Sequence, residues 1–83
     1  MNYGLDINLG AVHFVRSLRR TEGDRLVRWM DQLQDNPFQE GELTVFDATG
    51  REIQVSRFDR FAIYHWTDHA VKTVRVVRIE TNA

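Results

Sequence analysis

The alternation of apolar and polar residues in the first half of the chain predicts one short strand followed by two helices. Between Tyr3 and Leu9 apolar side chains occupy every second position, which is the period of a β-strand. Asn8 suits a helix N-cap, and the apolar residues after it recur at helical spacing, at Ala11, Phe14, Val15 and Leu18. Thr21 is the predicted cap of a second helix. The apolar stripe of that helix consists of Leu26, Trp29, Met30 and Leu33.

The second half of the chain has the pattern of β-strands separated by short turns. Pro37 disfavours helical geometry at Asn36, which ends the second helix, and Gly41 permits a turn. Segments rich in β-branched and aromatic residues follow at 43–47, 51–58, 60–66 and 72–80, with a hairpin loop that carries Gly50. The predicted fold class is α+β: an N-terminal strand, a helical hairpin, and three to four antiparallel strands that form one sheet. We expect the helices to pack on one face of that sheet, with Ile53 and Val55 beneath them.

Length and composition place the chain among small globular domains. Its 83 residues predict a single domain, 1–83, with a small core. The absence of Cys excludes a disulfide framework and a thiolate nucleophile, and it fits a reducing cytoplasm. The first residues lack the basic and apolar regions of a signal peptide, and no apolar run approaches the roughly 20 residues that cross a bilayer. We therefore expect a cytoplasmic protein without a membrane partner.

The charges are nearly balanced overall but are unevenly distributed along the chain. The net charge is −1, and the only Lys among eleven basic residues is Lys72. Every charged residue from Asp31 to Asp47 is acidic, and basic residues return at Arg51. The isoelectric point of about 6.3 lies far below the basic range of a nucleic-acid-binding domain. This balance favours a mixed solvated surface over an RNA-binding stripe.

The stretch "YHWTDH" at 64–69 holds several residues that could act in catalysis or bind a metal. Segment 60–66 is largely apolar at both its odd and its even positions, so both faces of the strand are expected to be covered. This predicts a central strand with Tyr64 and Trp66 in the core or facing a partner. His65 is a candidate general base, although a hydrogen-bonded histidine within the sheet is the favoured interpretation. His65 and His69 are four residues apart, but a strand followed by a turn does not give them the metal-binding geometry of a helix. We expect no metal site and no cofactor.

Several segments together resemble the RelE/ParE superfamily of bacterial toxins. They are the order of elements, the "NPF" that ends the second helix, "GREIQVSRFDRFAIYHW", and the closing "VKTVRVVRIE". The resemblance covers nearly the whole chain, and it rests on the core strands rather than on a catalytic signature. It implies a small sheet with a helical hairpin on one side and a cognate antitoxin protein as partner. It also implies growth inhibition, either through cleavage of ribosome-bound mRNA or through binding to DNA gyrase.

The chain departs from the ribonuclease members at the positions that carry charge. Those members place a Lys-x-Lys pair in the strand where this chain has Glu52 and Gln54. The Arg that is usual near the start of the next strand corresponds to Phe61, with Arg60 adjacent. Cleavage of RNA requires stabilisation of charge on the scissile phosphate, so these replacements remove part of the positive field that the reaction uses.

Two functions for a toxin of a type II toxin–antitoxin system therefore remain open. The first is a ribosome-dependent mRNA endoribonuclease with atypical site residues, in which His65 transfers protons and Arg57 and Arg75 hold the phosphate. The second is a non-catalytic binding protein, either a ParE-like gyrase inhibitor or a degenerate toxin that retains antitoxin binding. In both cases we expect the partner to offer an acidic or amphipathic segment to the arginines and exposed aromatic residues of the chain.

Overall fold

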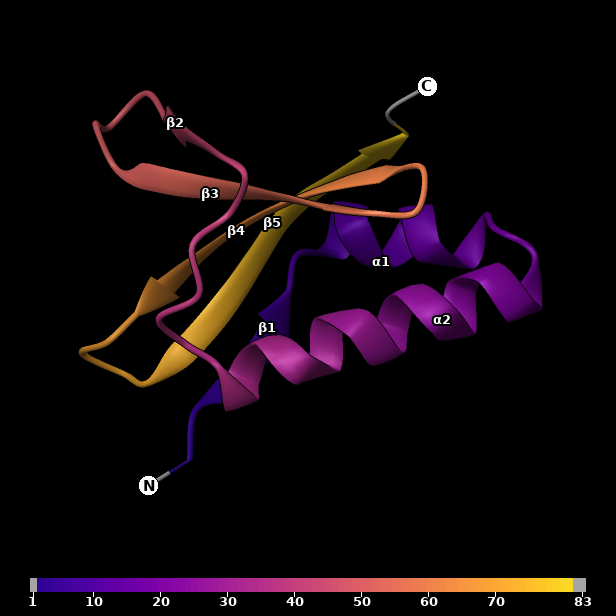
Figure 1. Cartoon of the computed structure of the whole chain (residues 1–83), viewed down its shortest axis with the longest axis horizontal. Coiled ribbons are helices and arrows are strands. Elements are labelled where there is room, and N and C mark those ends of the chain that lie inside the picture. The colour runs from indigo at the N-terminus through magenta and orange to yellow at the C-terminus, as the bar shows by residue number, and fades with distance from the viewer. Residues whose placement is uncertain (1, 82–83) are drawn as a thin grey trace.

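A five-stranded mixed sheet and a helical hairpin make up the fold (Figure 1). The computed structural model describes residues 2–81, so three positions of the predicted domain 1–83 lie outside the described residues. Along the chain the elements are β1 (Gly4–Ile7), α1 (Leu9–Arg16), α2 (Arg20–Asp31), the 3₁₀ turn η1 (Gln32–Asp35), β2 (Leu43–Phe46), β3 (Glu52–Phe58), β4 (Phe61–Asp68) and β5 (Thr73–Thr81). The predicted α+β class and the predicted order of elements are confirmed.

The strands lie in the order β1-β5-β4-β3-β2, which places β4 at the centre of the sheet as the sequence predicted. The four strands from β2 to β5 pair antiparallel with their neighbours. β1 pairs parallel with β5, with Gly4 opposite Thr73. A register shift between Tyr64 and His65 marks an irregularity in the β4–β5 ladder. The sheet is therefore mixed, with a single parallel pair at the β1 edge.

A side-chain cap is present at the start of α1 and absent at the start of α2. The side chain of Asn8 accepts a hydrogen bond from the Gly10 amide at 2.7 Å, so the predicted cap of α1 is confirmed. The predicted cap at Thr21 is wrong, because α2 begins at Arg20 and Thr21 lies inside its first turn. Gly23 allows α2 to approach α1 closely, since a Cβ there would lie 3.3 Å from the Val15 carbonyl oxygen. Within the described residues, neither helix is long and apolar enough to cross a lipid bilayer.

The core lies between the helical hairpin and one face of the sheet. Both predicted helical stripes contact it: Phe14 meets Phe61 edge to face with ring centroids 5.7 Å apart, and Trp29 stacks on Phe58 at 5.8 Å. Its buried residues are Ala11, Leu26, Met30, Leu33, Phe61, Ile63, Val74, Val76 and Ile79.

Ile53 and Val55 are also buried, but the expectation that they lie beneath the helices is wrong. Successive side chains of a strand point to opposite faces, and Ser56 of β3 faces the helix layer through its contact with His65. Ile53 and Val55 therefore lie on the other face, where they share cavities with Tyr64.

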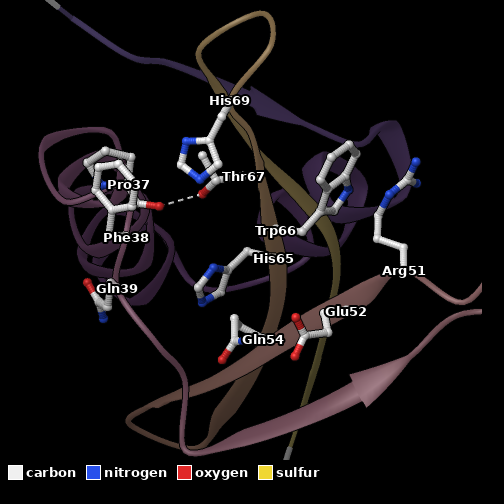
Figure 2. Close-up of a pocket in the computed structure, with 10 residues that line it drawn as sticks. All are labelled: Pro37, Phe38, Gln39, Arg51, Glu52, Gln54, His65, Trp66, Thr67 and His69. Carbon is white, nitrogen blue, oxygen red and sulfur yellow. Dashed lines mark hydrogen bonds between the residues drawn. The ribbon is translucent and has the colours of Figure 1, made fainter.

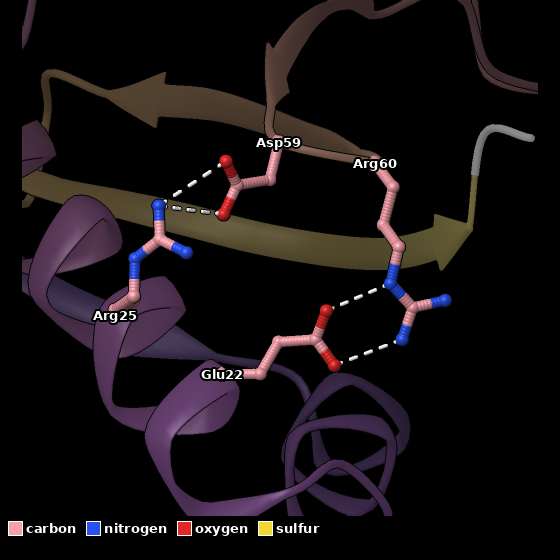
Figure 3. A network of polar contacts seen from close by, with 4 residues as sticks. All are labelled: Glu22, Arg25, Asp59 and Arg60. Carbon is pink, nitrogen blue, oxygen red and sulfur yellow. Dashed lines mark hydrogen bonds and ion pairs between the residues drawn. The ribbon is translucent and has the colours of Figure 1, made fainter.

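Two ion pairs attach α2 to the turn between β3 and β4 (Figure 3). Arg60 donates two hydrogen bonds to the carboxylate of Glu22, at 2.7 and 2.8 Å. The guanidinium of Arg25 lies 2.9 Å from a carboxylate oxygen of Asp59, which occupies the turn with φ 53°. The bidentate geometry of the Glu22–Arg60 pair gives α2 a defined polar contact with the turn, in addition to the apolar core that holds the helices on the sheet.

Candidate functional site

The sheet separates the three residues that the sequence proposed as catalytic. His65 faces the helix layer, where it contacts Ser56. Arg57 pairs with Ala62 and Arg75 with Trp66 in the sheet register, and the alternation of side chains places both arginines on the opposite face. We call this opposite face, which the helices do not cover, the open face. The structure does not bring His65 together with either arginine, and their catalytic roles remain predictions.

A cavity of about 410 Å³ lies between the 37–39 segment and the strands β3 and β4 (Figure 2). Two contacts fix its wall: the Thr67 hydroxyl donates to the Pro37 carbonyl at 2.8 Å, and the Phe38 ring stacks on His69 at 4.7 Å. His65 and Gln54 project toward the 37–39 segment, whereas Trp66 and Arg51 lie on the other side of β4. The lining residues are Pro37, Phe38, Gln39, Arg51, Glu52, Gln54, His65, Trp66, Thr67 and His69.

His65 is held as a buried neutral imidazole at the base of this cavity. Only 2% of the residue is exposed, its Nε2 lies 2.8 Å from the Ser56 hydroxyl, and its ring meets Trp29 edge to face. Burial lowers the pKa of His65 to about 4, so the ring is uncharged near neutral pH. A general base works best when its pKa lies near the working pH, and His65 is far from that condition. Its observed role is a satisfied polar contact between β3 and β4.

The other polar groups around the cavity do not create a positive field. Gln54 accepts a hydrogen bond from the Gly41 amide at 2.8 Å, so it tethers the segment that leads into β2. Glu52 is exposed and adds a negative charge. The guanidinium of Arg51 lies 3.9 Å from the Trp66 ring centroid and 3.8 Å from Asp47. One arginine beside two carboxylates does not supply the charge that a phosphate site requires.

On the open face, each arginine lies near a carboxylate. The contacts run from Arg57 to Glu42 at 3.7 Å, from Arg75 to Asp6 at 2.9 Å and Asp68 at 3.9 Å, and from Arg78 to Glu80 at 2.7 Å. Affinity for a nucleic acid comes mainly from basic groups that neutralise phosphates. Because acidic side chains already accompany these arginines, the open face is unsuited to a polyanion.

Two cavities lined by both apolar and charged residues lie on the open face, one on each side of Tyr64. One of about 430 Å³ lies over Val55 and Ala62, and another of about 330 Å³ lies over Ile53 and Trp66. The Tyr64 hydroxyl donates to Glu80 at 2.7 Å, and this hydrogen bond raises the pKa of Tyr64. Apolar hollows rimmed by paired charges are typical of a surface that binds another protein. The sequence identified Tyr64 and Trp66 as partner-facing candidates, but it did not indicate the hollows between strands distant in sequence.

Solved structures that superimpose on this chain include RelE toxins. The chain superimposes on RelE from the archaeal RelE–RelB complex of Pyrococcus horikoshii with a TM-score of 0.78 and 14% identity, over 100% of this chain and 98% of that one. For the toxin–antitoxin complex RelBE2 of Mycobacterium tuberculosis the TM-score is 0.79, with 15% identity and coverage of 98% and 99%. For a double mutant of E. coli toxin RelE in the free state the TM-score is 0.68 and the identity is 17%, over 98% of this chain and 84% of that one.

The fold of this chain is therefore the RelE fold, as the resemblance in its strands predicted. At identities of 14–17% the superposition establishes the fold, while function has to be argued from the residues themselves. No protein-family model matches the sequence, and no curated protein matches it.

Proposed function

We propose that the chain is the toxin-side member of a toxin–antitoxin pair and that it acts by binding a protein rather than by cleaving RNA. The toxin role is supported by the RelE fold over the full described chain and by two similar structures that are toxin–antitoxin complexes. The observation that carries the binding mode is the placement of His65 on one face of the sheet and of Arg57 and Arg75 on the other.

Cleavage of RNA by a side chain requires a base within hydrogen-bonding reach of the 2′-hydroxyl and a cation at the phosphate. His65 has its Nε2 engaged with Ser56 and only 2% of its surface exposed. Arg57 and Arg75 lie across the sheet from it, each beside a carboxylate. This arrangement lacks the convergence of groups that the reaction needs.

The open face suits a protein partner. Its two apolar hollows are large enough to take aliphatic or aromatic anchors, and its paired charges form a polar rim. We assign the antitoxin to this surface as the stable partner. DNA gyrase, which the ParE resemblance implies, is the protein target that this mode of action would inhibit.

A second candidate function is supported by one observation. His65 lines the cavity beside the 37–39 segment, together with His69 and Arg51. In this alternative, RNA on the ribosome enters the cavity and His65 transfers the proton.

Inducible expression of four proteins separates the two functions: the wild type, His65→Gln, the double variant Arg57→Ala with Arg75→Ala, and His13→Gln as an exposed histidine control. Growth and cleavage of ribosome-bound message are followed together. Binding predicts growth arrest without message cleavage in the wild type, persistence of arrest in His65→Gln, and weakening of arrest in the double arginine variant. Message cleavage that falls roughly 10²–10⁴-fold in His65→Gln alone would establish the second candidate instead.

The toxin–antitoxin pairing has its own test. The protein encoded by the neighbouring reading frame is co-expressed with the chain, and complex formation is measured by co-purification and titration calorimetry. We expect a stable complex. A chain that remains alone in both measurements contradicts the proposed pairing.

A further inference from the structure

Three aromatic rings from distant parts of the chain meet beside the start of β1. Tyr3 precedes β1, Phe38 lies between η1 and β2, and His69 lies in the turn between β4 and β5. Phe38 stacks on His69, as Figure 2 shows, and Tyr3 meets both rings edge to face. The Tyr3 hydroxyl oxygen lies 2.8 Å from Nδ1 of His69. Because 73% of Phe38 is exposed despite the stack, its second ring face is open to a ligand.

A cavity of about 490 Å³ lies next to this cluster, between the start of β1 and the end of the helical region (Figure 1). Its lining residues, of which none is basic, are Asn2, Tyr3, Gln34, Asp35, Pro37 and Phe38. The side-chain amide of Gln34 donates its N–H to Asp31, so its amide oxygen remains as an acceptor. Among residues 2–81, Asp35 forms no ion pair. The cavity therefore offers an aromatic wall and a carboxylate that lacks a counter-ion.

The same molecule shows which group fits such a combination. Within residues 2–81 every arginine that lies over an aromatic ring also contacts a carboxylate; these are Arg25, Arg51, Arg60, Arg75 and Arg78. The guanidinium of Arg51 lies 3.9 Å from the Trp66 ring centroid and 3.8 Å from Asp47. A guanidinium suits both neighbours, because its plane stacks on a ring while its N–H groups reach a carboxylate. Phe38 and Asp35 offer the same two groups without an arginine between them.

The charges around the cavity also favour a cation. No Lys, Arg or His occurs in residues 31–50, whereas this segment holds the carboxylates of Asp31, Asp35, Glu40, Glu42 and Asp47. Among the residues that the structure describes, Asp31 and Glu40 form no ion pair. Such a negative field attracts cations and repels phosphates. The cavity is therefore suited to an organic cation and unsuited to a nucleic acid.

We propose that this cavity binds a guanidinium group, which stacks on the open face of Phe38 and pairs with the carboxylate of Asp35. The contacts of His69 with Phe38 and Tyr3 hold the aromatic wall in place. The guanidinium belongs either to a free small molecule or to an arginine side chain of another protein, since both offer the same chemistry. The proposal does not depend on the function proposed above, because neither the RelE fold nor the open face enters into it.

Three probes test the ligand chemistry on the full, ¹⁵N-labelled chain by nuclear magnetic resonance. They are agmatine, the blocked peptide acetyl-Gly-Arg-Gly-amide, and the same peptide with citrulline, the neutral isostere of arginine. We expect saturable shifts of the amides of residues 34–39 with millimolar dissociation constants for the two guanidinium probes, and no saturable shifts for the citrulline peptide. Tighter binding of agmatine identifies a free guanidinium compound as the ligand, and tighter binding of the peptide identifies a protein arginine.

Variants of the chain locate the binding to this cavity. Asp35→Asn removes the counter-ion and Phe38→Leu removes the aromatic face, and each should weaken binding of the guanidinium probes about fivefold. Asp24→Asn is the matched control for charge, and Phe46→Leu is the matched control for an exposed aromatic residue, since neither Asp24 nor Phe46 lines the cavity. Both controls should bind as the wild type does. Circular dichroism and thermal melting confirm that all four variants are folded.

Two results overturn the proposal. One is equal binding of the arginine and citrulline peptides, including the case in which neither binds, because the site would then not recognise the charge. The other is binding of the guanidinium probes that both Asp35→Asn and Phe38→Leu leave unchanged, because the probes would then bind elsewhere on the chain. Neither result bears on growth arrest or on the pairing with an antitoxin, which are measured separately.

Discussion

The Nε2 atom of His65 and the hydroxyl oxygen of Ser56 lie 2.8 Å apart between β4 and β3, and neither residue is more than 5% exposed. A buried polar pair of this kind is stable because each partner satisfies the other. It also ties the protonation of His65 to folding, since a charged imidazole at this position would be desolvated. The residue that the sequence singled out for catalysis is therefore a point of pH sensitivity in the fold.

We expect the chain to lose stability as the pH falls from about 6.5 to about 4. The pKa of His65 in the folded chain is lowered to about 4 from the ordinary value of 6.5. Between these two pH values the unfolded chain binds a proton at His65 that the folded chain does not bind. This contribution is fully present above pH 6.5 and is lost toward pH 4, and its size is up to about 3 kcal/mol. Urea unfolding at a series of pH values measures it.

The control for this experiment is His13→Gln, because His13 is exposed on α1. His65→Gln should flatten the pH dependence of the free energy of unfolding between pH 6.5 and 4, and His13→Gln should leave it as in the wild type. An equal slope in the wild type and His65→Gln would contradict the assignment.

Gly41 should not tolerate a side chain. A Cβ at this position would lie 2.5 Å from the Val55 carbonyl oxygen and 2.7 Å from its backbone carbon, and a backbone cannot move aside as a flexible side chain does. Gly41→Ala should therefore destabilise the fold by about 2 kcal/mol, within the usual cost of overpacking. Gly4→Ala is the control, since a Cβ there meets nothing within 4 Å. Chemical unfolding of both variants gives the comparison, and equal stabilities would refute the close approach.

Trp29 should contribute to stability through the stack that it forms with Phe58. The ring centroids are 5.8 Å apart at 25°, and the indole also meets His65 edge to face at 6.4 Å. Trp29→Ala should cost about 3 kcal/mol, the lower end for loss of a large aromatic residue, because Trp29 is only partly buried. The free energy of unfolding from guanidinium titration measures the loss. A cost within about 0.5 kcal/mol of zero, as for an ordinary surface substitution, would refute the packing.

The ion pair of Glu22 and Arg60 should give a small, salt-dependent coupling. The hydrogen bond from Arg60 lowers the pKa of Glu22, so the contribution of the pair is present above the ordinary glutamate value of 4.5 and fades as the pH falls below it. A double-mutant cycle with Glu22→Gln and Arg60→Gln at low and high ionic strength measures the coupling. We expect the coupling free energy to decrease at high ionic strength. A coupling free energy that is the same at low and high salt would contradict the assignment of this ion pair as solvent-exposed.

The sequence predicted the secondary structure well because the patterns that specify it are local. Asn8 caps α1 through a neighbour two residues away, and Pro37 follows the end of the helical region as expected. The prediction for Thr21 failed because α2 begins one residue earlier, at Arg20, after an N-cap residue, Arg19, whose side chain forms no capping hydrogen bond. A helix start without a capping side chain has no signature in the local sequence.

The candidate site was less predictable because it depends on which face each strand presents. Alternation within β3 shows that Ile53 and Val55 share a face, but it does not say which face the helices cover. Because of the same ambiguity, the sequence prediction grouped His65 with Arg57 and Arg75. The sheet register places His65 on one face and both arginines on the other. The stack of Phe38 on His69 joins residues from two distant turns, so it becomes visible only in three dimensions.

The position of β5 has a consequence for how the chain folds. β5 (Thr73–Thr81) lies between β1 and β4, and within residues 2–81 it is the one strand that pairs with β1. Until residues 73–81 join the sheet, β1 has no neighbouring strand and the core lacks Val74, Val76 and Ile79. Contacts between such distant parts of a chain form late in folding. Closure of the sheet and completion of the core are therefore one event, in which Gly4 meets Thr73.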